Sequence, residues 1–287
     1  MKYGQEIPQN ILEEMNSIDA KISIIIPCYN SESTIERTLL SVFRQDYDNI
    51  EVIVIDGASQ DNTMEVLMQF ESRITKIIGE SDNGIYDAIN KGVKLATGEL
   101  VGMISSNDWL NEGTIKNLLS NYTKYPDADI YHANILKIKD LNGKQYIKER
   151  KGESPDRLCH RMSIRHPSCF VKREWYERHT YDTRYKIAGD YEFLLRSKLD
   201  NANFQYCDEA YVIMSDGGMS TTFRTTIETV KIQIQYHYYK EAVILLIMRV
   251  FLLLKSRFLR VIANLLLPSS RLEKLEDKKW NGKIYNN

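Results

Sequence analysis

The chain has 287 residues but only four cysteines, and none of them stands in a Cys-x-x-Cys pair. Because Cys28, Cys159, Cys169 and Cys207 lie far apart, the sequence indicates neither a zinc site nor a disulfide framework, which fits a reducing compartment. Net charge is also nearly absent, since 38 basic residues oppose 39 acidic ones. A general nucleic-acid-binding surface is therefore not expected.

Glycine-rich phosphate motifs are missing as well. No Gly-x-Gly-x-x-Gly follows the first strand-like run and no Gly-x-x-x-x-Gly-Lys-Ser/Thr occurs, which disfavours dinucleotide oxidoreductases and P-loop enzymes. Residues 1–21 carry Glu6, Glu13, Glu14 and Asp19 rather than a charged-then-apolar export signal. We expect a cytoplasmic protein with one large domain and an appendage, or two modest domains.

The first 125 residues alternate between strand-like and helix-like segments. Continuous apolar runs separated by helices are typical of a parallel sheet that is buried on both faces. We expect strands at 22–27, 50–55, 74–78 and 100–104, and helices at 32–44, 62–70, 85–96 and 112–122. Ser31 or Ser33 is the expected N-cap of the first helix, and Asp61, Asn62 and Thr63 are expected to cap the second.

The rhythm changes after Pro126. Strand-like pieces at 129–137 and 144–150, joined by Asn142-Gly143, predict a hairpin. A helix at 189–198 and a strand near 204–214 are expected to follow. We therefore divide the chain into a leader at 1–20, a first half at 21–125, a second half at 126–224 and a tail at 225–287.

Polar side chains follow the carboxyl ends of three expected strands, the edge at which open parallel sheets bind ligands. Tyr29 and Asn30 come after Pro27, Asp56 ends the second strand, and Asp108 follows the fourth. Tyr29 offers a flat face to a base, and Asp56 can accept hydrogen bonds from ribose hydroxyls or a base. A carboxylate such as Asp108 suits Mg²⁺ or Mn²⁺, because hard cations prefer oxygen ligands. The set predicts one site for a phosphorylated ligand.

A further polar segment precedes the helix expected at 85–96. Asp82 can take a base edge there, and Lys91, two turns further on, can meet a phosphate. The alternative for Asp82-Asn83-Gly84 is a plain turn and helix start, which these residues favour in any protein.

The chain resembles family 2 of the glycosyltransferases, which have the GT-A fold, in the segments SIIIPCYNSESTIERTLLSVFRQDY, EVIVIDGASQDNT, ESDNGIYDAINKG and ATGELVGMISSNDW. The likeness covers roughly residues 21–220, and the nearest subgroup is that of bacterial capsule, O-antigen or exopolysaccharide enzymes. It implies an α/β fold with a mostly parallel central sheet flanked by helices and a Rossmann-like nucleotide-binding half. It also implies a nucleotide diphosphate-sugar donor, a UDP-sugar first of all, and a Mg²⁺ or Mn²⁺ cofactor.

Carried over residue by residue, the resemblance implies donor contacts from Pro27, Tyr29, Asn30, Asp56, Asp82, Lys91, Asn107 and Asp108. Within this set Lys91 would contact the diphosphate and Asp108 would bind the metal. Ser106 stands where the family commonly has the first Asp of Asp-x-Asp, so only the final carboxylate is kept.

The second half supplies the implied acceptor side. Ala188-Gly189-Asp190-Tyr191-Glu192-Phe193 resembles the base motif of the family, and Asp190 matches its general base, which is ionised at pH 7 with an ordinary pKa. His166 contacts acceptor or phosphate in this interpretation, and is a hydrogen-bonded core histidine in the alternative. Gly218 belongs to a segment that resembles a loop near the donor, or is simply a flexible turn.

The tail is strongly apolar, but its longest uncharged stretch, 242–248, is too short to span a bilayer as a helix. On a helical projection, a polar and basic stripe gathers Arg249, Ser256, Arg257, Arg260 and Asn264. Such a helix suits the membrane interface. It can equally pack on the catalytic domain or on a second subunit as a homodimer.

The sequence therefore predicts an inverting glycosyltransferase that acts on a glycan or polyprenyl-diphosphate-linked acceptor at the inner face of the cell membrane. No Gln-x-x-Arg-Trp motif of processive synthases occurs, so one sugar per encounter is expected. The alternatives are a sugar nucleotidyltransferase and a non-catalytic membrane adaptor that keeps the nucleotide site. The first would need a basic glycine-rich loop that residues 28–37 lack, and donor hydrolysis would separate the second from an enzyme.

Overall fold

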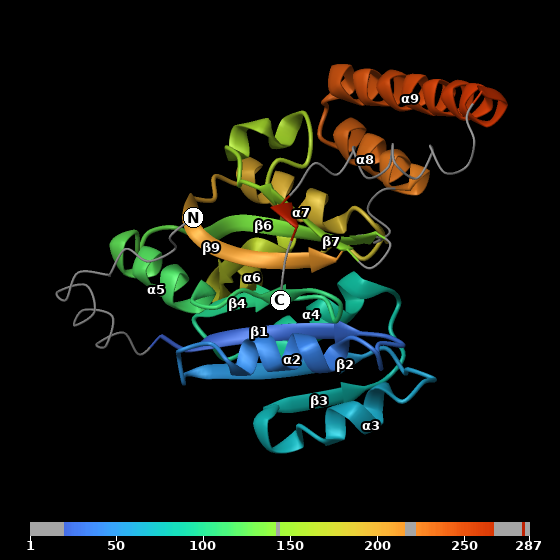
Figure 1. The fold of residues 1–287 in the computed structure, drawn as a ribbon. Helices are drawn as coiled ribbons and strands as arrows, with labels where there is room; N and C mark the ends of the chain where they lie inside the picture. Colours follow the sequence, from blue (N-terminus) through green and yellow to red (C-terminus); the bar gives the residue numbers. More distant parts are fainter. Residues whose placement is uncertain (1–19, 142–143, 216–221, 267–282, 285–287) are drawn as a thin grey trace.

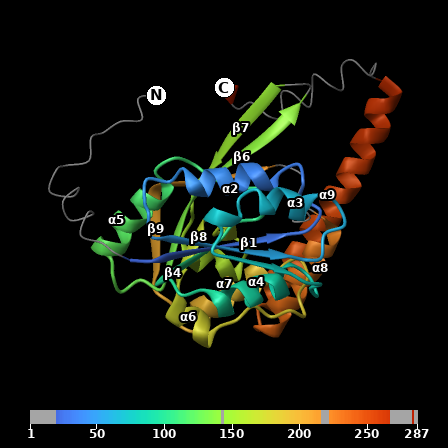
Figure 2. The same ribbon diagram turned by 90° about the horizontal axis from the view of Figure 1, so that it is seen from below.

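The computed structural model describes residues 20–141, 144–215, 222–266 and 283–284. A mixed ten-stranded sheet runs through it in the order β10-β7-β6-β8-β4-β1-β2-β3, with β5 and β9 paired beside this path. Figure 1 shows the strands one below another with α2 in front of them, and the tail helices α8 and α9 at one end. Helices cover both faces: α2 and α3 lie on one side, and α4, α6 and α7 on the other (Figure 2).

The first half has the expected βα alternation, and the expected elements end within three residues of the observed ones. Its elements are β1 (Ile22–Cys28), α2 (Ile35–Phe43), β2 (Ile50–Asp56), α3 (Thr63–Met68), a 3-10 turn (Glu71–Arg73), β3 (Lys76–Gly79), α4 (Ile85–Leu95), β4 (Leu100–Met103), β5 (Trp109–Leu110) and α5 (Thr114–Lys124). Strands β1 to β4 pair in parallel. Their carboxyl ends therefore meet at one edge of the sheet.

Alternate residues of β1 enter two different hydrophobic cores. Ile24 and Ile26 pack with residues of α2, α3 and α5, whereas Ile25 packs with residues of α4, α6 and α7. Every residue of β1 is buried. This is the pattern expected of a central parallel strand with helices on both faces.

The second half departs from the parallel order. Its elements are β6 (Ile130–Leu141), β7 (Lys144–Arg150), the 3-10 turns η2 (Pro155–Cys159) and η3 (His166–Ser168), β8 (Cys169–Lys172), α6 (Arg173–Arg178), α7 (Gly189–Leu199) and β9 (Phe204–Ser215). β6 and β7 form the predicted hairpin, whose Asn142-Gly143 connection lies outside the described residues. β8 runs antiparallel to both β4 and β6. Parallel pairing joins β1 to β4 in the first half and β6 with β9 in the second, and the whole sheet is mixed.

The helix starts near the sheet edge differ in part from the prediction. The N-cap of α2 is Thr34, so the prediction of Ser31 or Ser33 is wrong. Ser31 instead precedes the helix in a turn, where its carbonyl oxygen accepts hydrogen bonds from the amides of Thr34 and Ile35 at 3.0 Å. At α3 the N-cap is Asn62, as expected.

The tail forms two helices, α8 (Phe223–Gln235) and α9 (Tyr239–Leu266), and the short strand β10 (Lys283–Ile284) pairs with β7. α8 is anchored in the protein, because it buries Ile232 and Gln233. α9 is the outermost element (Figure 1). The leader prediction falls outside the described residues except for Ala20.

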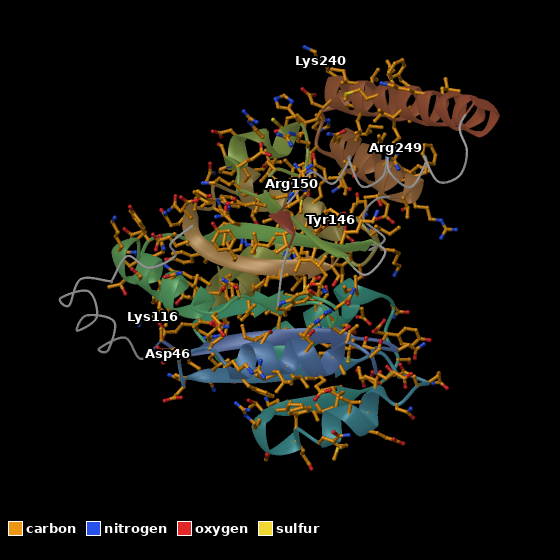
Figure 3. The ribbon with its side chains drawn as sticks, in the orientation of Figure 1. Asp46, Lys116, Tyr146, Arg150, Lys240 and Arg249 are labelled. Atoms are coloured by element: carbon orange, nitrogen blue, oxygen red, sulfur yellow. The ribbon has the colours of Figure 1, made fainter. Side chains whose placement is uncertain are left out.

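The outward surface of α9 is apolar. Ile247, Phe251 and Leu254 are each more than 60% exposed, whereas Ala242 is buried and Arg249 is half-buried. Figure 3 shows Arg249 between α9 and α8. Arg249 therefore lies on the packed side rather than on an outward basic stripe. The other predicted stripe residues have side chains outside the described set. In the described ranges, no helix has the length and apolar character that crossing a membrane requires.

Candidate active site

Hydrogen bonds join the carboxyl ends of β1, β2 and β4. Asn30 adopts a left-handed conformation with φ 47°, and its amide donates to Ser59 Oγ at 2.8 Å. Its side-chain oxygen accepts from the Gln60 amide at 2.8 Å. On the other side, the hydroxyls of Ser31 and Ser106 are 2.7 Å apart. The residues predicted at three separate strand ends are therefore in one region.

The Asp56 carboxylate is fixed by residues of its own loop and of the neighbouring strand. It is only 1% exposed, and its carboxylate accepts hydrogen bonds from the amide of Ser59 at 2.9 Å and from the Ser59 hydroxyl. The thiol of Cys28 lies 3.6 Å from the same carboxylate, and burial, reinforced by Asp56, raises the pKa of that thiol. Asp56 thus fixes the loop that carries Gly57 and Ala58.

Gly57 brings Tyr29 and Asp82 close together. A Cβ atom on Gly57 would lie 2.6 Å from Asp82 Oδ2 and 3.5 Å from Tyr29 Cδ2. The ring of Tyr29 is 60% exposed. Asp82 is partly buried, and its Oδ1 accepts from the Gly84 amide at 2.8 Å. An exposed flat ring beside a fixed carboxylate suits a base, which presents both a face and polar edges.

The Lys91 ammonium is held by neighbouring residues of this region. Its ammonium lies 2.9 Å from Glu80 and 3.6 Å from Asp87, and it donates to the Ser81 carbonyl at 3.0 Å. These contacts hold the segment just before Asp82. A diphosphate contact from Lys91 would require the ammonium to leave Glu80.

Asp108 is buried beside the end of β9. It is 6% exposed, its Oδ1 accepts from the Ser215 amide at 3.2 Å, and burial raises its pKa to about 7. Arg37 is its nearest charge compensation, and the same guanidinium donates at 3.3 Å to Asn107 and stacks on Trp109. Arg37 gave no signal in the sequence, because it lies 70 positions from its partner.

The protein ligands available around Asp108 fit a cation that takes most of its ligands from phosphate and water. In the described ranges no group of three or more His, Cys, Asp or Glu side chains gathers for a metal. Asn107 is exposed, and its side-chain oxygen is already used by Arg37. A single carboxylate suits Mg²⁺ or Mn²⁺ only when phosphate oxygens and water complete the shell.

Asp190 lies in the first turn of α7, in contact with the first half of the chain. Its Oδ1 accepts from the Tyr86 hydroxyl at 3.2 Å and from the Tyr191 amide at 2.8 Å. Tyr86 belongs to α4, the helix that follows Asp82. Burial raises the pKa of Asp190 to about 6, while these hydrogen bonds and the Arg165 guanidinium oppose the rise.

The turn before Asp190 is fixed from both sides. Tyr86 donates to the Ile187 carbonyl at 2.8 Å, and a Cβ atom on Gly189 would come within 2.8 Å of the Tyr86 ring. From α8, the carboxylate of Glu228 accepts the amides of three consecutive residues, Lys186, Ile187 and Ala188, at 3.1, 2.8 and 2.8 Å. Glu228 stands in a tail segment without any motif, so the sequence offered no means of finding it.

The predictions for His166 and Gly218 differ in outcome. His166 is 2% exposed and bonds the Tyr181 hydroxyl, and burial lowers its pKa to about 4. Tyr181 in turn stacks on Tyr86. This environment matches the core-histidine alternative rather than an acceptor contact. Gly218 lies outside the described residues.

The sequence comparison defines the class of protein. Residues 23–180 match the model of the family described as Glycosyl transferase family 2, which is more than half of the chain. The chain therefore belongs to this family. A PGL/p-HBAD biosynthesis glycosyltransferase of Mycobacterium bovis (strain BCG / Pasteur 1173P2) is 27% identical over 179 residues, which cover 61% of this chain and 68% of that protein.

Solved structures show the same fold. The crystal structure of S. aureus TarS 1-349 in complex with UDP-GlcNAc aligns with a TM-score of 0.59 and 22% identity, over 74% of this chain and 64% of that one. The mannosyltransferase PcManGT from Pyrobaculum calidifontis, in complex with GDP-Man and Mn2+, aligns with a TM-score of 0.57 and 17% identity, over 88% and 82%. The GT-A fold class predicted from the sequence is confirmed.

Proposed function

We propose that this family 2 glycosyltransferase transfers a sugar from a nucleotide diphosphate donor, a UDP-sugar first of all, to a hydroxyl group with inversion. One observation carries the proposal: Tyr86, four residues after Asp82, holds Asp190 at 3.2 Å. The carboxylate proposed to bind the nucleobase lies just before α4, and the first turn of α4 contacts the carboxylate proposed to accept the proton, although Asp190 is 104 residues from Tyr86.

In this mechanism Asp190 accepts the proton of the acceptor hydroxyl as its oxygen bonds to the anomeric carbon. The bond from that carbon to the diphosphate oxygen breaks, and its electron pair leaves with the nucleoside diphosphate. Because the attack comes from the face opposite the leaving group, the configuration inverts. A carboxyl with its pKa near 6 is largely ionised at pH 7 and is still a better base than an ordinary aspartate.

Donor binding falls to the first half. Tyr29 would stack on the base, Asp82 would bond its edge, and Asp56 would act by shaping the Gly57 loop. Asp108 would hold Mg²⁺ or Mn²⁺, which supplies charge stabilisation for the departing diphosphate. The UDP-GlcNAc and GDP-Man complexes of the similar folds support a nucleotide-sugar donor.

The acceptor is a glycan or a polyprenyl-diphosphate-linked glycan of the bacterial surface, met at the inner face of the cell membrane. The names of similar proteins, which concern PGL/p-HBAD biosynthesis and poly(ribitol-phosphate), support a cell-surface acceptor. The apolar outward face of α9 supports peripheral membrane contact rather than full exposure to water. The competing occupant of that face is a second copy of the chain.

Product analysis with a panel of nucleotide sugars tests the reaction. A cognate donor should stabilise the folded protein, by about 2.7 kcal/mol at a hundredfold excess over its Kd. Slow release of nucleoside diphosphate from that donor identifies a transferase. With added pyrophosphate, its consumption and the release of nucleoside triphosphate and sugar 1-phosphate would identify a sugar nucleotidyltransferase instead, and binding without any turnover would identify an adaptor.

Vesicle flotation of the full chain tests the membrane contact. Replacing the exposed Ile247 and Phe251 by Glu should release the protein from vesicles that contain anionic lipid, because it places charge on the outward face of α9. Met68→Glu on α3, where the side chain is 49% exposed, is the matched control and should float like the parent. If the double variant still floats but loses a dimer, α9 is a subunit interface.

A further inference from the structure

Arg165 lies close to Asp190 and forms no direct ion pair with any residue that the structure describes. Its carbonyl oxygen accepts from the amide and hydroxyl of Ser168 at 2.9 and 2.7 Å, and Ser168 donates to Ala133 in β6. The backbone is therefore fixed to the sheet. Within the described part of the chain the guanidinium is partly buried and forms neither a hydrogen bond nor an ion pair, although Glu153 and Asp190 lie near enough to act on it electrostatically.

Two further arginines surround Arg165. Arg150 ends β7 (Figure 3), and Arg161 follows η2; both lower the pKa of Arg165 in addition to the effect of burial. Arg161 lies 2.6 Å from Glu153, which also pairs with Arg157 at 2.9 Å. One carboxylate is thus shared by two arginines. Arg150 and Arg161 are exposed, so the cost of the excess positive charge falls on the partly buried Arg165, and a bound anion would offset it.

The cluster borders the tail helices. Gln233 of α8 donates to the carbonyls of Cys159 and His160, at 3.4 and 3.2 Å. His160 lies 3.4 Å from Glu241 in the first turn of α9. The loop that carries Arg161 is therefore seated on the helix pair whose outer face is apolar (Figure 1). The proposed catalytic base, the arginine cluster and the apolar face of α9 therefore follow one another across the protein.

We propose that Arg165, with Arg150 and Arg161 beside it, forms a subsite for the phosphate group of an anionic acceptor. A guanidinium binds phosphate oxygens through two parallel hydrogen bonds, which gives both affinity and orientation. A phosphate held there would present the acceptor hydroxyl to Asp190. This subsite deepens the proposed function and rests on it.

A simple counter-ion role for Arg165 does not account for the cluster. Asp190 alone would need one cation beside it, whereas Arg150 and Arg161 repel Arg165, and the nearby Glu153 is already paired with Arg157 and Arg161. The phosphate can belong to a lipid-linked diphosphate or to a water-soluble phosphorylated glycan. The neighbouring face of α9 favours the lipid.

Vesicle binding by the full chain tests the subsite. The probes are phosphatidylcholine vesicles with and without polyprenyl diphosphate, and inorganic pyrophosphate as a soluble competitor. The parent protein should prefer the diphosphate vesicles, and pyrophosphate should compete. Arg165→Gln should reduce that preference and the pyrophosphate affinity by about tenfold each, which corresponds to about 1.4 kcal/mol. Arg150→Gln, at an exposed position that is safe for folding, should reduce both by about threefold.

Arg224→Gln, on the exposed start of α8, is the matched control and should change neither quantity. An Arg165-dependent affinity for pyrophosphate without any preference among vesicles would assign the phosphate to a soluble acceptor. Unchanged affinities in both Arg165→Gln and Arg150→Gln overturn the subsite, and so does an equal loss in Arg224→Gln. UDP-sugar binding by the parent protein separates the cases, because its absence refutes the proposed function itself.

Discussion

Two groups of carboxylates in this region of the molecule are held in different ways. Asp56 is fixed by Ser59, three residues away, and Asp61 by Thr63, two residues away. Asp190 accepts from the adjacent Tyr191 amide but also from Tyr86, 104 residues away, and Asp108 accepts from Ser215, 107 residues away. The residues that shape the loops are held locally, whereas the two to which we assign chemistry are held across the molecule.

This difference has an electrostatic counterpart. Burial raises the pKa of Asp108 to about 7 and that of Asp190 to about 6, and their hydrogen bonds and nearby cations only partly oppose it. A carboxylate that is left partly uncompensated is costly to the fold and useful to a reaction. The following variants test whether the long-range contacts serve function and the local ones serve structure.

The largest effect is expected at Asp190. Asp190→Asn should reduce transfer by about 10³-fold, because the amide cannot accept the proton of the acceptor hydroxyl, while UDP-sugar affinity stays within about twofold. In the parent protein kcat/KM should fall as pH drops through about 6, since the base is active only when ionised and its pKa is raised to that value. Initial rates between pH 5 and 8 measure both effects.

Asp200→Asn, at the other end of α7, is the matched control for this variant. Its rate and pH profile should equal those of the parent protein. Normal turnover in Asp190→Asn would remove Asp190 from the mechanism.

A second, smaller effect is expected at Asp108. Asp108→Asn should lower UDP affinity in the presence of Mn²⁺ by about 100-fold, because the carboxylate proposed to bind the metal is lost. Affinity without metal should change little. Calorimetric titration with UDP, with and without Mn²⁺, measures the two values, and equal values in parent and variant would exclude a metal at Asp108.

The contact between Glu228 of α8 and the backbone amides before Asp190 should have an intermediate effect on turnover. Glu228→Gln replaces one acceptor oxygen by a donor that faces the amides of residues 186–188, so kcat should fall about tenfold with an unchanged donor KM. The loss of stability should be about 1–3 kcal/mol, measured by urea unfolding. Lys231→Gln, one turn further along α8, should alter neither quantity. A loss of stability with normal kcat would make Glu228 purely structural.

The difference between local and long-range contacts also explains which site residues could be predicted from the sequence. Tyr29, Asn30, Asp56 and Asp108 were predictable, because parallel strands bring their carboxyl ends together whatever the long-range packing is. Ser31 was wrongly predicted as a helix N-cap. Its hydroxyl instead lies beside that of Ser106, which is 75 positions away in the sequence.

Long-range partners gave no local signal at all. Tyr86, Glu228 and Arg37 each act on a residue at least 40 positions distant, and nothing in their own segments marks them. Arg249 shows the same limit in the tail. Helical periodicity placed it on a polar and basic stripe without saying what that stripe faces, and in the structure Arg249 lies between α9 and α8.

The smallest effects are expected at two neighbouring positions in the loop held by Asp56. Gly57→Ala should weaken UDP binding about fivefold, since its Cβ atom would come 2.6 Å from Asp82 Oδ2 and displace that carboxylate. Ala58→Gly should leave UDP binding unchanged. Because Ala58 has φ 61°, glycine there relieves left-handed strain but adds flexibility to the unfolded chain, so the free energy of unfolding should change by less than about 1 kcal/mol. Equal UDP affinities in the two variants would mean that Asp82 does not contact the nucleotide, and that this side of the base site is wrongly placed.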